Sequence, residues 1–491
     1  MTTRIAAFDG RALIDGQRVA ARSGALFDCV SPVDGTLLTQ VARCDVSDVD
    51  IAVQAGRAAF DDKRWRGLAP AQRRKILQRF SELVLTHADE LAETETRDMG
   101  KPIRYARAVD VNSTANCLRW YGEAIDKVYD EIAPTPETAL ALITREPVGV
   151  VGVIVPWNYP MIMAAWKIAP ALAVGNSVVL KPSEKSPLSA LRLGELALEA
   201  GIPAGVLNVV PGFGPEAGAA LALHMDVDCI AFTGSTRVGK SIHVMAGQSN
   251  LKRAWTELGG KSPNIVFADC PDLDKAVDAA VGSIFFNQGE SCNAPSRLFL
   301  EAGIRERFVE RLLQRVPAYA PGDPLDPNTV MGAIVDRVQM ETVLRYIESG
   351  RREGAVLLAG GEQDRVQSGG YYVQPTVFDG VRNDMTIARE EIFGPVLSII
   401  TFTDAAEAVR LANHSVYGLQ AGVWTRDINK AHGVARALRA GTVHVNQYDE
   451  DDITVPFGGF KQSGVGRDKS LHAFDKYTEV KTTWVRIDSP V

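Results

Sequence analysis

The chain has 491 residues, of which 46% are hydrophobic and 23% are charged, and its formal net charge at pH 7 is -7. This length exceeds the size at which one hydrophobic core keeps growing, so we expect two or three domains. The composition excludes fibrous, collagen-like and disordered classes. The negative charge and the absence of a long basic run argue against nucleic acid or an anionic membrane as the main partner.

The sequence shows no targeting, membrane-spanning or metal-binding pattern. The N-terminal segment MTTRIAAFDGRALIDGQRV lacks the apolar stretch of about 7–15 residues that a secretory signal needs. The most apolar run, residues 148–154, is far shorter than the roughly 20 residues that cross a bilayer. Six cysteines form no CxxC pair and seven histidines form no ligand pattern. We therefore expect a cytoplasmic protein with reduced cysteines, no membrane partner and no metal.

Hydrophobic periodicity in the N-terminal third predicts helices. Apolar residues recur near helical spacing over residues 45–101, which indicates a packed helical layer, and another helix is expected over residues 104–128. The segment EIAPTPET at residues 131–138 is typical of a surface turn because it combines prolines with small polar residues. Residues 139–154 are expected to be rich in strands.

The middle of the chain has the pattern of an α/β protein. Between residues 149 and 267, short β-branched runs alternate with Ala- and Leu-rich helical stretches, which is typical of βαβ units and a parallel sheet. The runs are VGVIV, SVVLKP, VLNVVPG, CIAFTG and NIVFAD. We predict a doubly wound nucleotide-binding domain there and a second α/β domain over about residues 275–445. The tail YTEVKTTWVRI alternates apolar and polar residues and predicts a strand that pairs with another strand, in this chain or in a neighbouring subunit.

Three segments place reactive side chains beside glycines or prolines. Cys292 follows Gly289 in FFNQGESCNAPSR, where a small backbone lets a ligand approach the thiol. Glu257 precedes two glycines in WTELGGKSPNIVF. Asn158 lies in VPWNYP, where an amide N–H is suited to an oxyanion. Taken singly, these residues have ordinary alternatives: a buried thiol, a surface carboxylate and a rigid turn.

Two further segments have features of nucleotide binding. FTGSTRVGK joins a strand to a helix, and its glycines, Gly234 and Gly239, leave N–H groups at the helix N-terminus free for phosphate. LKPSEKSP places Lys181 and Glu184 at the end of a strand, where they could hold ribose hydroxyls. Neither segment matches GxGxxG or a Walker A loop closely.

Seven motifs occur in the order PWNYP, KPSE, FTGSTRVG, ELGGK, FFNQGESC, EEIFGPV and PFGGFKQSGVGRD. In this order and over essentially the whole chain, the sequence resembles the aldehyde dehydrogenase superfamily. The resemblance implies a Rossmann-type NAD-binding domain over residues 1–128 and 149–259 and an α/β catalytic domain over residues 260–460. It also implies a small β oligomerisation element with the C-terminal tail over residues 129–148 and 461–491, and a homodimer or homotetramer.

The resemblance also assigns catalytic roles. Cys292 would attack the aldehyde to form a thiohemiacetal, with the oxyanion held by Asn158 and the Cys292 N–H, and Glu257 would activate water against the resulting thioester. Two positions depart from the commonest pattern, since Glu290 replaces Gln and Asp468 replaces Glu. A CoA-acylating dehydrogenase and a non-catalytic homologue are the alternative classes. Relatives that acylate CoA usually lack the ELGG glutamate.

NAD is the cofactor that the resemblance implies, in preference to NADP because Glu184 would repel a 2′-phosphate. Lys181 and Glu184 would contact the adenosine ribose, Ser235 the pyrophosphate and Glu391 the nicotinamide ribose. The full set of expected cofactor residues is Ile154, Trp157, Lys181, Ser183, Glu184, Gly214, Gly218, Phe232, Thr233, Gly234, Ser235, Val238, Leu258, Glu391 and Phe393.

The substrate is expected to be a small aldehyde derived from a polyamine. Agreements such as KPSEKSPLSA and NIVFADCPDL resemble γ-glutamyl-γ-aminobutyraldehyde dehydrogenases of bacterial putrescine catabolism. Enzymes for 4-guanidinobutyraldehyde or betaine aldehyde and broad-specificity enzymes share most motifs. The acidic stretch of residues 449–452 would attract a cationic substrate, unless it is only a solvated loop. The expected substrate residues are Trp166, Asp451 and Phe457.

Overall fold

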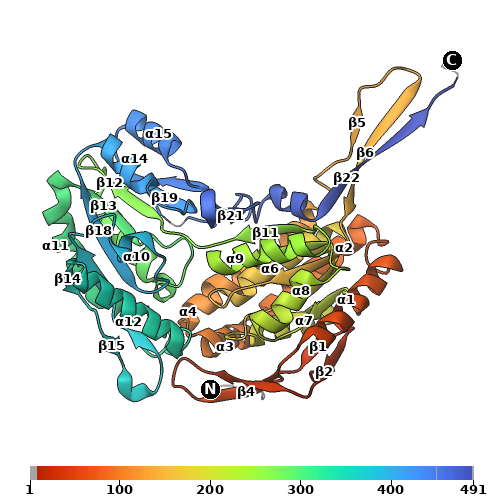
Figure 1. Ribbon diagram of the computed structural model, residues 1–491, viewed down its shortest axis with the longest axis horizontal. Coiled ribbons are helices and arrows are strands. Elements are labelled where there is room, and N and C mark those ends of the chain that lie inside the picture. Colours follow the sequence, from red (N-terminus) through yellow and green to blue (C-terminus); the bar gives the residue numbers. More distant parts are fainter. Residues whose placement is uncertain (1–7, 449, 489–491) are drawn as a thin grey trace.

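The computed structural model describes residues 8–448 and 450–488. Figure 1 shows two α/β lobes beside each other and a β arm that projects away from them. One lobe contains the first half of the chain and the other contains most of the second half. No helix among the described residues is long and apolar enough to cross a membrane.

The first lobe contains a sheet of eight strands among the described residues, in the order β2-β1-β9-β8-β7-β10-β11-β21. Neighbouring strands from β9 to β11 run parallel. The chain adds β8 and β9 on one side of β7 and β10 and β11 on the other, so the order reverses between β7 and β10. This doubly wound arrangement confirms the predicted fold, and ligands bind at such a reversal. The strands are β1 Ala12–Ile14, β2 Gln17–Val19, β7 Val150–Ile154, β8 Ser177–Lys181, β9 Leu207–Val209, β10 Cys229–Thr233, β11 Arg253–Glu257 and β21 Gly464–Val465.

Helices cover both faces of this sheet, and the helical layer predicted over residues 45–101 is confirmed. The helix predicted over residues 104–128 is interrupted by a π-helical segment, Ala106–Val111, between α4 and α5. Asp45 caps α1 by accepting the Ser47 N–H. The helices of the lobe are α1 Val46–Asp61, α2 Pro70–Thr86, α3 Ala88–Met99, α4 Ile103–Tyr105, α5 Asn112–Ala124, α6 Pro160–Val174, α7 Leu188–Ala200, α8 Ala219–Leu223 and α9 Thr236–Gln248.

The second lobe contains a sheet of seven described strands, in the order β14-β17-β18-β13-β12-β19-β20. Strand β12 comes from NIVFAD, which the sequence pattern grouped with the first sheet. That expectation was wrong, because β12 pairs with β13 and β19 instead. The strands are β12 Pro263–Val266, β13 Arg297–Glu301, β14 Val356–Ala359, β17 Thr376–Asp379, β18 Val396–Phe402, β19 Gln420–Trp424 and β20 Thr442–Val445. The helices are α10 Leu273–Phe285, α11 Arg305–Arg315, α12 Arg337–Arg352, α13 Thr386–Arg389, α14 Ala405–Asn413 and α15 Ile428–Ala437.

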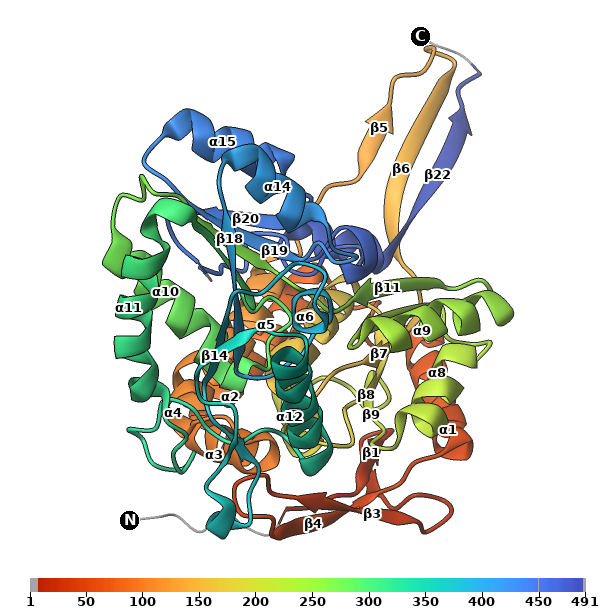
Figure 2. The same ribbon diagram turned by 60° about the vertical axis from the view of Figure 1, so that its left-hand side comes forward.

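The arm consists of β5 Glu131–Ala133, β6 Ala139–Pro147 and β22 Thr478–Arg486. Strand β22 pairs with β6 along its whole length, so the predicted C-terminal strand finds its partner within the chain. The first part of the expected turn at residues 131–138 is strand β5 instead. Figure 2 shows the arm standing clear of both lobes. Two short ribbons complete the fold, β3 Leu26–Val30 with β4 Leu37–Ala42 and β15 Gln363–Asp364 with β16 Tyr372–Val373.

Candidate active site

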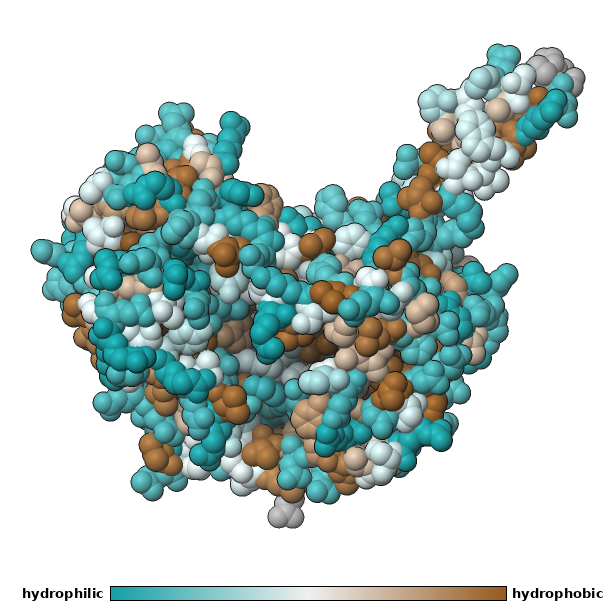
Figure 3. Space-filling model, viewed as in Figure 1, coloured by the Kyte–Doolittle hydropathy of each residue, from teal (hydrophilic) through white to brown (hydrophobic). Residues whose placement is uncertain are grey.

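A cavity of about 860 Å³ is lined by residues of both lobes. Figure 3 shows the corresponding hollow in the face between the lobes. On the first lobe, several lining residues lie at or just after the carboxyl ends of β7, β10 and β11, at the reversal of the strand order, and others come from helices. The fold therefore places this cavity where a doubly wound sheet binds its ligand.

The loop that carries Cys292 has an unusual backbone. Asn287 and Gln288 adopt left-handed conformations, with φ of 49° and 58°, directly after α10. Gly289 follows with φ of 71°, and a Cβ at this position would lie 2.2 Å from the carbonyl oxygen of Gly394. Only glycine fits there, and the strained turn delivers the partly exposed Cys292 to the cavity.

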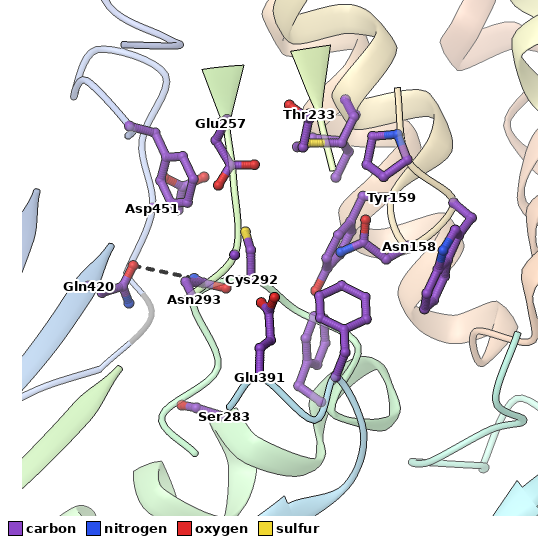
Figure 4. A pocket seen from close by; sticks show the side chains of 18 of the residues that line it. Asn158, Tyr159, Thr233, Glu257, Ser283, Cys292, Asn293, Glu391, Gln420 and Asp451 are labelled. Atoms are coloured by element: carbon purple, nitrogen blue, oxygen red, sulfur yellow. Dashed lines mark hydrogen bonds between the residues drawn. The ribbon is translucent and has the colours of Figure 1, made fainter. Parts of the chain in front are cut away.

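The two glycines after Glu257 allow the second lobe to approach the first. A Cβ at Gly259 would lie 2.1 Å from a Glu391 carboxylate oxygen, and one at Gly260 would lie 2.2 Å from the Cys292 carbonyl oxygen. The Gly260 N–H donates to Glu391 Oε1 at 2.9 Å. The ELGG segment thus brings Glu257, Cys292 and Glu391 around one space, as Figure 4 shows.

The acidic groups of this space have raised pKa values. Both Glu257 carboxylate oxygens are buried without a hydrogen-bond partner. Burial raises the pKa of Glu257 to about 8 and that of Glu391 to about 7. Burial, together with these two carboxylates, also raises the pKa of the Cys292 thiol well above its usual value. Glu257 can therefore exchange a proton at mildly alkaline pH, which suits a general base.

Asn158 is held by the Glu290 carbonyl and by Asn287. Its Nδ2 donates to the Glu290 carbonyl at 2.8 Å. Asn287 Nδ2 donates to the Asn158 carbonyl at 3.0 Å and to the Glu290 carbonyl at 3.2 Å. An amide group carries two hydrogens, so the second hydrogen of Asn158 remains for an oxygen in the cavity. Sequence reasoning missed Asn287, although it stands in the NQG part of the cysteine motif.

The two residues that depart from the common pattern, Glu290 and Asp468, are both buried and make specific polar contacts. Glu290 accepts the Val335 N–H at 3.1 Å, and burial raises its pKa well above the usual value. Asp468 is buried between Lys167, at 2.9 Å, and Lys476. Burial opposes ionisation of Asp468, yet the two lysines lower its pKa to about 2.

The expected cofactor residues fall into two groups. Those that line the cavity are Trp157, Thr233, Gly234, Ser235, Glu391 and Phe393. Ser235 caps α9 by accepting the Val238 N–H, and the buried Thr233 hydroxyl has no hydrogen-bond partner. The rings of Trp157 and Phe393 are 5.1 Å apart, edge to face.

The second group lies outside the cavity lining, and Ile154, Lys181, Ser183 and Glu184 are at or just after the ends of β7 and β8. Lys181 is buried at the end of β8 and pairs with Glu184 at 3.0 Å. A Cβ at Gly218 would lie 3.9 Å from Lys181 and 4.0 Å from Ile154. The remaining members of the expected set, which also lie outside the cavity lining, are Ser183, Gly214, Phe232, Val238 and Leu258.

The expected substrate residues share one end of the cavity. Trp166, Asp451 and Phe457 all line it, and the two rings are 5.2 Å apart. Asp451 already has a cationic partner in this structure, because Lys469 forms an ion pair with it, and its role in binding a substrate stays a prediction. Asp449 lies outside the described residues.

Comparisons with known proteins identify the family of this chain. Residues 19–483 match the model of the aldehyde dehydrogenase family. The chain is 51% identical over 483 residues to the NADP/NAD-dependent aldehyde dehydrogenase PuuC of Escherichia coli, covering 98% of this chain and 97% of that protein. The chain therefore belongs to the aldehyde dehydrogenase family and is an NAD(P)-dependent oxidoreductase.

Two solved structures show the same fold at high identity. The γ-glutamyl-γ-aminobutyraldehyde dehydrogenase of Burkholderia cenocepacia is 59% identical, with a TM-score of 0.96. The indole-3-acetaldehyde dehydrogenase AldA of P. syringae, in complex with NAD+, is 59% identical, with a TM-score of 0.97. In each case the alignment covers 98% of this chain and 97% of the other.

Proposed function

We propose that this enzyme oxidises an aldehyde to a carboxylate through a thioester on Cys292. The observation that carries the proposal is the convergence of Cys292, Glu257 and Asn158 on one cavity from both lobes. A thiol, a carboxylate with a pKa of about 8 and an amide N–H supply a nucleophile, a base and an oxyanion donor.

The residues support a cycle of two halves. The Cys292 thiol loses its proton to solvent as its sulfur adds to the aldehyde carbon, and the second amide hydrogen of Asn158 and the Cys292 N–H hold the oxygen of the thiohemiacetal. After oxidation, Glu257 takes a proton from water as that water attacks the thioester carbon. The acid leaves and Cys292 regains its proton. Glu257 is the feature that favours transfer to water over transfer to CoA.

We further propose NAD as the preferred cofactor. When bound, NAD accepts the hydride that the substrate carbon gives up. Lys181 and Glu184 would hold the adenosine ribose, Ser235 and the free N–H groups at the start of α9 the pyrophosphate, and Glu391 the nicotinamide ribose. The fit is supported by the unpartnered Thr233 hydroxyl and by the space left by Gly218 beside Lys181.

The proposed substrate is a polyamine-derived aldehyde such as γ-glutamyl-γ-aminobutyraldehyde. The high identity to an enzyme of that name supports this choice. Aldehydes such as 4-guanidinobutyraldehyde and betaine aldehyde, or a broad range of aldehydes, are the alternatives. We also propose that the chain forms a homo-oligomer through the arm, where Ile132, Val480 and Trp484 are exposed apolar side chains.

The test of the proposed function is NADH formation with γ-glutamyl-γ-aminobutyraldehyde and with hexanal, for the wild type and for Cys292→Ala. We expect turnover in the wild type with NAD and a loss of at least about a thousandfold in the variant, because no thioester can form. Cys270→Ala, which removes a buried thiol of the second lobe, is the matched control. Activity that survives in Cys292→Ala would remove the nucleophile from the proposal.

A further inference from the structure

Lys469 places a cation against the wall of the cavity at the substrate end. Its Nζ lies 5.3 Å from the centre of the Trp166 ring and 5.9 Å from that of the Phe457 ring. The same ammonium forms an ion pair with Asp451. The side chain of Lys469 is 2% exposed, so its charge is surrounded by these three partners and not by solvent.

The three partners form the kind of site that binds an ammonium group. Aromatic faces within about 6 Å of a cation attract it, and a carboxylate adds a full opposite charge. All three partners line the cavity, whose described lining contains four carboxylates (Glu257, Glu391, Glu450 and Asp451) and no lysine or arginine. The protein's own lysine therefore occupies a position where the ammonium of a substrate would otherwise be stabilised.

The backbone around Lys469 is fixed in a strained conformation. Lys469 and Ser470 both have positive φ, 61° and 50°, which is uncommon for residues other than glycine. The Ser470 N–H donates to the Ile453 carbonyl at 2.8 Å, and the Tyr121 hydroxyl donates to the Ser470 carbonyl at 3.1 Å. These contacts hold the start of the Lys469 side chain in place and direct it toward the two rings.

We propose that Lys469 selects aldehydes whose far end carries a carboxylate, alone or within an α-amino acid zwitterion, and disfavours aldehydes whose far end carries only a cation. This inference rests on the proposed function and narrows its substrate class. A substrate carboxylate would be attracted to the Lys469 charge, while the ammonium of a zwitterion would face the exposed carboxylate of Glu450. An ammonium alone would compete with Lys469 for Asp451.

The test uses three aldehydes of equal length that differ only in the terminal group: hexanal, 6-oxohexanoate and 6-aminohexanal. The quantity measured is kcat/KM for each charged aldehyde relative to hexanal, in the wild type and in Lys469→Met. We expect the ratio of 6-oxohexanoate to 6-aminohexanal to fall by at least about tenfold in Lys469→Met, because attraction and repulsion are lost together. γ-Glutamyl-γ-aminobutyraldehyde should follow 6-oxohexanoate.

Two variants complete the design. Lys469→Arg keeps the charge and should retain the preference of the wild type. Lys430→Met is the matched control, since Lys430 pairs with Asp269 at 3.1 Å and lies 4.7 Å from the centre of the Phe267 ring, but neither of these partners lines the cavity. An unchanged ratio in Lys469→Met, or an equal change in Lys430→Met, would overturn the inference. Absence of wild-type turnover with every one of these aldehydes, γ-glutamyl-γ-aminobutyraldehyde included, would instead contradict the proposed function itself.

Discussion

Two regions of the cavity are held in different ways. The first, here called the floor, contains Glu257, Gly259, Cys292 and Glu391, and the second is the substrate end with Trp166, Asp451 and Phe457. At the floor, backbone atoms approach so closely that a Cβ at Gly259 or Gly260 would lie 2.1–2.2 Å from its neighbour. At the substrate end, Asp451 and the two rings are joined by one flexible side chain, that of Lys469. A substitution at the floor disturbs two lobes, whereas one at Lys469 changes only contacts between side chains. The chemistry is thus set by the backbone and the substrate preference by side chains.

The electrostatics of the two regions also differ. Glu257 and Glu391 are buried at the floor, and burial raises their pKa values. The Asp451 carboxylate at the other end is more than half exposed and has a cation beside it. Proton transfer is therefore favoured at the floor, and recognition of a charged group at the substrate end.

The largest effect that would sharpen this comparison is expected from Glu257→Gln. The glutamine cannot accept a proton from water, so steady-state turnover should fall by about a thousandfold. Thioester formation requires only that the Cys292 thiol lose its proton to solvent, so rapid mixing should still show one equivalent of NADH per Cys292. Loss of that first equivalent would assign Glu257 to the earlier step instead.

The pH dependence of the same step tests the role of burial. Because the pKa of Glu257 is raised to about 8, the carboxyl is protonated at lower pH and cannot act as a base there. Steady-state kcat should therefore rise with pH through about 8, while the amplitude of the first NADH equivalent should not. If kcat instead rises with pH near the ordinary carboxyl pKa of about 4, burial in the cavity does not raise the pKa of Glu257 in solution.

An intermediate effect is expected from Asn158→Ala. Removing one oxyanion donor should lower kcat by about a hundredfold, with little change in the KM for NAD. Asn287→Ala is the informative control, because it removes a donor to the Asn158 carbonyl but leaves the Asn158 amide in place. We expect a smaller loss there. Equal losses would mean that Asn158 acts only by shaping the loop.

Much of the floor could be predicted from the sequence, and most of the substrate end could not. The ELGG and NQG segments contain both a reactive residue and the glycines that its close contacts require, so short motifs carry the information. The pair of Asp451 and Lys469 joins two loops and depends on how each is folded. Likewise, β-branched periodicity predicted strand Pro263–Val266 but not its sheet, because buried parallel strands have the same pattern in both lobes.

The smallest effect concerns the cofactor end, which like the substrate end depends on one ion pair. Glu184→Gln removes a negative charge from the place proposed for the 2′-position and releases Lys181 from its partner at 3.0 Å. We expect kcat/KM for NADP relative to NAD to rise by about tenfold, because repulsion of the 2′-phosphate is lost and Lys181 can pair with it. The control is Glu199→Gln, an exposed residue at the far end of α7. An unchanged ratio would mean that neither Lys181 nor Glu184 contacts the adenosine ribose. Control of a binding preference by one ion pair would then apply only to the substrate end.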